Sequence, residues 1–502
     1  MGLIVARNML APSMEAIADK QKHLHAGILS FVAAVCAVSV TIVGYKGASA
    51  SGLALLSVGL LAAVLFAVLA TRPLIAVVIA LVFLTSPIPL ALSQQQSALV
   101  NMFLLGGASL GLVLRTPLRS LATDPMRSPI GIFAAYGVVS AAYGLWVGNE
   151  VSYVLGDCFQ VIEFALVYYL VAQLLRNRAQ LRLALRFWLV SMLVTVLVEL
   201  LLFALGPSAS HFLPSWDASS GSELVRTIDI DATILFAVLI NLHAVTRSRR
   251  QRFWIWVALV PTTINIALSL SRGLWLCTLV AGVVSLLLHC REERKRLLKA
   301  FALATFFVVL LAAALQTGSD SDSSLLSVFE GRVAYGGVQV AEGLAGTETM
   351  ATRRFLEMAI VGPQVLNSPW IGHGLGATYV IGGFAVLDAG TEAPIDHHFI
   401  HNLYVATAFR MGVIGFGLLL WILVRYFRQI RHVYMDLPLD SNKALIIGLV
   451  ASLAGQLVLS NTQPTLIDHP TCALIACAMA LSFRMATTTS QSKELMGLNN
   501  GV

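Results

Sequence analysis

The sequence predicts an all-α, polytopic membrane protein with about fourteen transmembrane helices and one large loop on the outer side of the membrane. A chain of 502 residues that is 57% hydrophobic and 12% charged has too much apolar surface for a soluble fold. Its apolar runs recur at the length that crosses about 30 Å of hydrocarbon, at 1.5 Å per helical residue. When these runs are taken as spans, 26 of the 33 Lys and Arg residues fall on one side.

Residues 1–315 form an N-terminal transmembrane bundle of about eleven helices, with a short outer loop at 206–230. Its expected spans are 26–44, 52–70, 73–91, 97–114, 129–147, 152–174, 183–205, 231–246, 253–270, 273–289 and 298–315. The large outer loop is 316–407, and the C-terminal helices lie within 408–485, at 408–424, 443–460 and 469–483. We expect the polar tail, 486–502, to be disordered and cytoplasmic.

Every alternate loop is basic if the N-terminus is cytoplasmic, as the positive-inside rule requires. The basic loops contain Arg72; Arg115, Arg119 and Arg127; Arg176, Arg178 and Arg182; Arg247, Arg249, Arg250 and Arg252; the run 291–299; and Arg425, Arg428 and Arg431. The opposite loops at 93–97, 148–151 and 461–468 contain no Lys or Arg. Both termini are therefore expected inside. The net charge of +7 lies beside anionic lipid headgroups, so we expect membrane lipids and no nucleic acid as partners.

The outer loop 316–407 is acidic, and a loop of this length is usually functional. Its middle, 352–366, has apolar residues at helical spacing but also Gly362 and Pro363. This pattern predicts a short interfacial helix that lies against the bundle.

Seven basic residues are exceptional because they fall on the outer side: Lys46, Arg226, Arg272, Arg332, Arg353, Arg354 and Arg410. Arg272 lies between two spans with almost no loop, where a guanidinium needs an anion or an acidic partner. Arg226 precedes a span and could instead pair locally with Asp229 or Asp231, and a purely structural pair is also open for Arg272. Arginines that converge at this depth suit a pyrophosphate, whose oxygens take bidentate contacts.

The outer loop also contains His373 and the cluster Asp396-His397-His398-Phe399-Ile400-His401-Asn402. A zinc site formed by Asp396, His397, His398 and His401 is one interpretation, although the spacing matches no closed zinc site. A second is that one histidine is a general base beside the arginines. A third is that these are ordinary hydrogen-bonded loop histidines.

Four motifs in this order resemble the O-antigen ligase and O-antigen polymerase superfamily, over about residues 225–425. His401-Asn402-Leu403-Tyr404-Val405, followed by Gly412-Val413-Ile414-Gly415-Phe416, is similar to the His-Asn pair and Gly-containing helix entry of that family. Arg354, fifteen residues before Pro369-Trp370-Ile371-Gly372-His373-Gly374-Leu375-Gly376, resembles its Arg…Pro-Leu-x-Gly-x-Gly segment. Ser271-Arg272-Gly273 and Arg226 resemble its two upstream arginine positions. The chain departs from the pattern at Met358, where Trp is common.

The resemblance implies a C-type glycosyltransferase-like fold and a metal-independent enzyme without a cofactor, in the bacterial inner membrane. Its donor would be an undecaprenyl-pyrophosphate-linked glycan. His401 would be the catalytic base of an inverting transfer at the periplasmic face. Arg226, Arg272 and Arg354 would bind the donor pyrophosphate, and Asn402, Arg353 and His398 would support the site. The flippase and the chain-length regulator of the same pathway are expected partners.

Three functions stay open at this level. We favour a polymerase of O-antigen or exopolysaccharide repeat units, because the span count is high and the acidic loop offers no cationic patch for a phosphorylated lipid A-core. A ligase that transfers the glycan to lipid A-core is the alternative. A lipid-linked oligosaccharide flippase is the second alternative, for which Asp157, Glu163 and Glu199 are the candidate residues in the spans.

Overall fold

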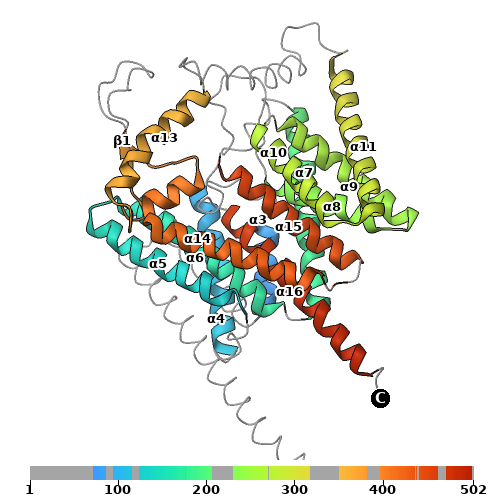
Figure 1. The fold of residues 1–502 in the computed structure, drawn as a ribbon, viewed down its shortest axis with the longest axis horizontal. Helices are drawn as coiled ribbons and strands as arrows, with labels where there is room; N and C mark the ends of the chain where they lie inside the picture. The colour runs from blue at the N-terminus through green and yellow to red at the C-terminus, as the bar shows by residue number, and fades with distance from the viewer. Residues whose placement is uncertain are drawn as a thin grey trace, which may run out of the picture. The chain divides into compact units, whose positions relative to one another are not determined.

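The computed structural model describes residues 72–85, 94–115, 124–175, 177–205, 230–269, 271–316, 350–380, 396–435, 437, 440–461 and 471–499. This part of the chain is helical except for turns and one antiparallel pair of two-residue strands, β1 (Tyr379–Val380) and β2 (Asp396–His397). Its helices are α3 (Pro73–Leu84), α4 (Gln94–Arg115), α5 (Arg127–Trp146), α6 (Val151–Leu174), α7 (Arg178–Leu205), α8 (Ile230–Val245), α9 (Arg249–Leu268), α10 (Arg272–Leu288), α11 (Arg291–Gln316), α13 (Met350–Asn367), α14 (Leu403–Met435), α15 (Ser441–Leu459) and α16 (Thr471–Asn499) (Figure 1).

The chain divides into two compact units. The first comprises residues 1–80 and 99–123, and the second comprises 81–98 and 124–502. Within the second unit, α15 packs against α8, α10 and α16, and α6 packs against α5 and α16. The candidate site lies entirely in this second unit.

Each expected span from 73–91 onward coincides with one helix, and the first two spans lie outside the described residues. Among the described residues, six helices are long and apolar enough to cross a membrane: α5, α6, α7, α14, α15 and α16. Shorter apolar helices include α3, α8 and α10. The chain is thus a multi-pass, α-helical membrane protein, and the total of fourteen spans stays a prediction.

Three helices can be compared in detail with the boundaries expected from the sequence. α13 agrees with the helix expected at 352–366 within the outer loop. α14 begins at Leu403, five residues before the span expected at 408. α16 continues to Asn499, although we expected 486–502 to be disordered; strong helix formers such as Lys493, Glu494 and Leu495 account for the continuation.

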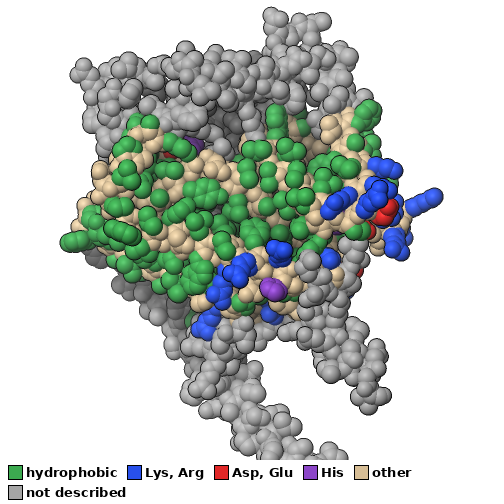
Figure 2. All heavy atoms as spheres, in the orientation of Figure 1, with side chains coloured by type: hydrophobic (Ala, Val, Ile, Leu, Met, Phe, Trp, Pro, Cys, Tyr) green, Lys and Arg blue, Asp and Glu red, His purple; other side chains and the backbone are tan. Residues whose placement is uncertain are grey.

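Hydrogen bonds join helix ends that the sequence places on the same side of the membrane. Arg178 at the start of α7 donates to the carbonyl oxygen of Thr488 in α16 (3.3 Å), and Arg296 in α11 donates to that of Ala244 in α8 (3.3 Å). At the other ends, the amide of Leu403 donates to the carbonyl oxygen of Ser460 (2.9 Å). On the face drawn in Figure 2, hydrophobic side chains cover the middle, while Lys and Arg side chains gather along one edge and around one end. The expected alternation of cytoplasmic and outer loops is therefore compatible with these hydrogen bonds between helix ends in the second unit.

Candidate active site

Helix α14 is broken at Gly412, immediately after the outer loop. Gly412 has φ 65° and ψ −170°, and a Cβ there would lie 2.2 Å from the carbonyl oxygen of Trp370. Only glycine tolerates both the left-handed φ and this approach. The break leaves backbone N–H and C=O groups without their hydrogen bonds inside the helix. In a membrane helix these groups need hydrogen-bond partners from another segment.

The glycine-rich turn at 368–376 supplies those partners. The amides of His373 and Gly374 donate to the carbonyl oxygens of Phe409 (2.8 Å) and Arg410 (2.9 Å), which precede the break. On its other side, the amide of Val413 donates to the carbonyl oxygen of Pro369 (2.7 Å). The Pro-x-x-Gly-x-Gly-x-Gly motif is therefore a backbone clamp on the broken helix.

A buried ion pair holds the clamp to α6. Arg410 donates from Nη1 to Oδ1 of Asp157 (3.1 Å), and the two side chains are 5% and 4% exposed. The second carboxylate oxygen, Oδ2, accepts from the amide of Gly376 (2.8 Å) and from Nε2 of His398 (3.3 Å). Nη2 of Arg410 also donates to the carbonyl oxygen of His398. Asp157 and Arg410 thus tie α6, the glycine turn, the loop at His398 and α14 together.

His398 belongs to this structural network. Its ring stacks on Tyr153 of α6, with centroids 4.2 Å apart and planes inclined by 11°. His373 is also engaged, since Nε2 donates to the carbonyl oxygen of Gln364 (2.8 Å). These contacts favour a positioning role for His398.

His401 has a different environment, because its ring is paired with Glu357 of α13. Nδ1 donates to Oε2 of Glu357 (2.7 Å), and the backbone amide of His401 donates to Oε1 (2.7 Å). The Glu357 side chain is 9% exposed, whereas that of His401 is 45% exposed. A carboxylate that accepts from Nδ1–H fixes the tautomer in which the Nε2 lone pair is available. The pair has the chemistry of an oriented general base.

Glu357 is the residue of the candidate site that sequence reasoning missed. In the sequence it is one of nine acids in the outer loop, 44 residues before His401. The available signal was its place on the expected loop helix, one turn after Arg353 and Arg354. No local pattern linked it to His401.

Asn402 fixes the position of His401 from the other side. Its Oδ1 accepts from the amides of Tyr404 (2.9 Å) and Val405 (3.1 Å), which makes it the N-cap of α14. Its Nδ2 donates to the carbonyl oxygen of Asn461 (3.4 Å), beyond the end of α15. The His-Asn pair therefore combines an exposed base with a helix cap that anchors it.

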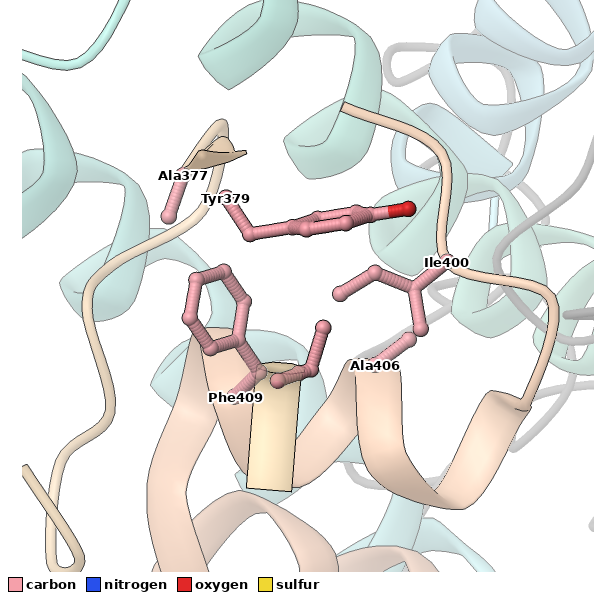
Figure 3. Close-up of a cluster of buried hydrophobic side chains, with 6 residues drawn as sticks. Ala377, Tyr379, Ile400, Ala406 and Phe409 are labelled. Carbon is pink, nitrogen blue, oxygen red and sulfur yellow. The ribbon is translucent and has the colours of Figure 1, made fainter. Parts of the chain in front are cut away.

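A cluster of buried hydrophobic side chains holds α13 against α14, so that Glu357 lies beside His401. In Figure 3 the Tyr379 ring extends over Phe409 towards Ile400. The cluster comprises Val361, Ala377, Tyr379, Ile400, Ala406 and Phe409. Burial first, and then the charge of Glu357, raise the pKa of Tyr379 to about 12, so the phenol stays protonated and its hydroxyl can donate to the carbonyl oxygen of Phe399 (3.5 Å).

The structure places the backbones of three of the four predicted arginines, and no arginine side chain among them is described. Arg272 is the first residue of α10, and Arg353 and Arg354 lie one turn before Glu357 in α13. Arg226 lies outside the described residues, so its expected pairing with Asp229 or Asp231 stays a prediction.

The starts of α8, α10 and α14 converge on the last turns of α15. A Cβ at Gly455 of α15 would lie 2.4 Å from the carbonyl oxygen of Cys277, in the second turn of α10. Gln456 donates to Thr233 Oγ1 in the first turn of α8 (2.7 Å). Since Leu403 is bonded to Ser460, the start of α10 and His401 share one end of α15. Helix N-termini carry partial positive charge, which favours an anion at this end.

Within the described residues, no three His, Cys, Asp or Glu side chains lie close enough together to hold a metal ion. His398 and His401 are instead paired with different carboxylates, Asp157 and Glu357. The side chains of Asp396 and His397 lie outside the described part of the chain, so the four-residue zinc hypothesis is not tested.

Comparison with known proteins identifies one family. A family model described as O-antigen ligase matches residues 257–422, from within α9 to within α14. The match includes Arg272, Arg354 and His401, and Arg226 precedes it. No curated protein matches the chain.

Proposed function

This multi-pass membrane protein belongs, through residues 257–422, to the O-antigen ligase family, and we propose on that premise that it polymerises lipid-linked polysaccharide repeat units. The product would be an O-antigen or an exopolysaccharide, and the donor an undecaprenyl-pyrophosphate-linked glycan. The observation that carries the proposal is the pairing of His401 with Glu357 near the end of α15, against which the first turns of α10 also pack.

In the proposed reaction, Nε2 of His401 accepts the proton of an acceptor sugar hydroxyl. The hydroxyl oxygen forms a bond to the anomeric carbon of the donor, while the bond from that carbon to the pyrophosphate oxygen breaks. The electron pair leaves with the undecaprenyl pyrophosphate, and a single displacement inverts the anomeric centre. Glu357 holds Nδ1–H and stabilises the imidazolium that forms. The proton then passes from His401 to solvent.

Pyrophosphate is a good leaving group, and guanidinium groups can stabilise its developing charge without a metal ion. Arg226, Arg272 and Arg354 take this role in the proposal, at a depth where forked contacts to phosphate oxygens are strong. Asn402 caps α14, and His398 holds the loop through Asp157 and Arg410. Arg353 supports the donor side of α13.

The proposed topology places both termini in the cytoplasm, fourteen spans in the bacterial inner membrane, and α13 and His401 on the periplasmic side. The flippase and the chain-length regulator of the pathway would then meet the protein in the same membrane. The basic edge in Figure 2 is the cytoplasmic edge in this proposal.

A ligase is the second candidate, because the matching family model carries that description. Its acceptor would be lipid A-core, and the chemistry at His401 would be the same. A transporter is less well supported, because Asp157 is neutralised by Arg410 and Glu199 accepts from Asn265 Nδ2 (2.7 Å) within the bundle.

Deletion of the gene, followed by gel analysis of surface glycan, tests the proposal. A single capped repeat unit in place of the polymer supports a polymerase. Bare core with accumulated lipid-linked polymer supports a ligase instead, and an unchanged glycan profile would refute both. Complementation with wild-type protein and with His401→Ala, at equal membrane levels, assigns the effect to the site.

A further inference from the structure

Exposed apolar side chains gather where α13 ends and the glycine-rich turn at 368–376 begins. Leu366 is 76% exposed and Trp370 is 69% exposed, and the side chain of Ile371 is exposed as well. Residues 358–387 include no Asp, Glu, Lys or Arg, although the outer loop on either side of them is acidic. Exposed apolar groups together with an absence of charge are typical of a segment that contacts lipid, where a charged side chain is costly.

The backbone of this turn makes its hydrogen bonds inside the protein. Every amide from Gly372 to Ala377 donates to a protein acceptor; in chain order the acceptors are the carbonyl oxygens of Ser368 (3.0 Å), Phe409 (2.8 Å), Arg410 (2.9 Å) and Ser140 (3.2 Å), Oδ2 of Asp157 (2.8 Å) and the carbonyl oxygen of Gly374 (3.3 Å). Nδ2 of Asn149 donates to the carbonyl oxygens of His373 and Leu375, at 3.0 Å each. Backbone that is not helical is tolerated close to the hydrocarbon only where protein groups bury and satisfy it in this way.

The turn is also continuous with the exposed apolar surface of α14. The amides of Val413 and Ile414 donate to the carbonyl oxygens of Pro369 (2.7 Å) and Trp370 (3.3 Å). Val413 and Ile414 have exposed apolar side chains and belong to a helix that is long and apolar enough to cross a membrane. Trp370 therefore lies at the level where this helix reaches the end of the span, the depth at which Trp side chains are enriched in membrane proteins.

We infer that Leu366, Trp370 and Ile371 form a lipid anchor, which inserts into the boundary between the headgroups and the acyl chains of the outer leaflet. The sequence predicted an interfacial helix before this turn, and the inference places the turn itself in contact with phospholipid. Leu366 follows Glu357 by nine residues of α13, which is at most about 14 Å at 1.5 Å per residue. The anchor therefore holds the pair of Glu357 and His401 close to the membrane surface, in a polymerase and in a ligase alike.

Photo-crosslinking in the full-length protein tests the inference. The photoreactive residue p-benzoyl-phenylalanine replaces Trp370 or Leu366, and both positions are exposed enough to take an aromatic side chain without repacking. Each variant is irradiated in native membranes and, after purification, in phosphatidylcholine vesicles, and mass spectrometry measures the fraction of protein bound to phospholipid. Trp421, exposed within the span of α14, is the positive control, and Glu292 in α11, with a side chain 68% exposed, is the water-facing control of matched exposure. Lipid adducts at Trp370 and Leu366 should match those at Trp421 to within about twofold and exceed those at Glu292 by at least about fivefold.

Lipid adducts at Trp370 and Leu366 that are no more abundant than those at Glu292 would show that the turn faces water, and would overturn the inference. Crosslinks from Trp370 to a second protein molecule in place of lipid would show a protein docking surface, and would overturn it as well. The measurement needs no glycan transfer, so its outcome is separate from that of the gene-deletion test of the proposed function.

Discussion

Removal of either member of the buried Asp157–Arg410 pair should destabilise the protein far more than removal of both. Asp157→Asn leaves the guanidinium of Arg410 inside the bundle without its counter-charge, and Arg410→Met leaves the carboxylate without its cation. Because the side chains of Arg410 and Asp157 are only 5% and 4% exposed, water can replace little of the electrostatic interaction that each substitution removes. An unpaired buried charge costs about 3–5 kcal/mol, so the unfolding equilibrium should shift by at least about 100-fold.

The assay is a double-mutant cycle with Asp157→Asn/Arg410→Met as the double variant. Unfolding by SDS in mixed micelles, followed by far-UV circular dichroism, gives the free energy of each protein. The double variant should recover most of the stability that the single variants lose. Strictly additive losses, or single losses below about 1 kcal/mol, would refute the view that this pair holds α6 to the broken helix.

Three further predictions concern other parts of the molecule. Arg272→Lys keeps the positive charge but loses the planar guanidinium, so transfer activity should fall sharply while the protein is present in the membrane at its normal level. Arg332→Ala, the control, should lower transfer activity only slightly. Full activity of Arg272→Lys would show that Arg272 has only a structural role. Single cysteines at positions 340 and 390 should react with an impermeant reagent in intact cells, and those at 248 and 293 should be protected; labelling at 293 would invert the assignment of the α9–α10 pair. Nε2 of His289 is hydrogen-bonded to Oδ1 of Asn241 in α8 (2.8 Å), and both side chains are buried. His289→Ala should therefore lower the midpoint of thermal unfolding, because it removes a partner of a buried amide, and an unchanged midpoint would contradict the importance of this contact.

Local patterns in the sequence predicted the helices well. Apolar length located every described helix except α13, because each span satisfies its own backbone in lipid and its hydropathy is a local property. The spacing around Met358 predicted α13, and the apolar run expected from 408 located the start of α14 to within five residues. The family resemblance made His401 the expected catalytic base, and that role stays a prediction.

Long-range contacts were beyond the reach of those patterns. Glu357 meets His401 across 44 residues, and Asp157 meets Arg410 across 253 residues. Both contacts depend on how the loop folds back on the bundle, which hydropathy does not encode. Arg410 was recognised as an exceptional outer arginine but received no role.

Glycosyl transfer by the reconstituted protein tests the central claim most directly. Wild-type protein, His401→Ala and Glu357→Gln are compared for initial rate and for donor binding, with and without EDTA. The account predicts no transfer by His401→Ala and a rate at least about 100-fold lower for Glu357→Gln, with donor binding intact in both and no effect of EDTA on the wild type. Full activity of His401→Ala, or loss of wild-type activity in EDTA that a divalent ion restores, would contradict it.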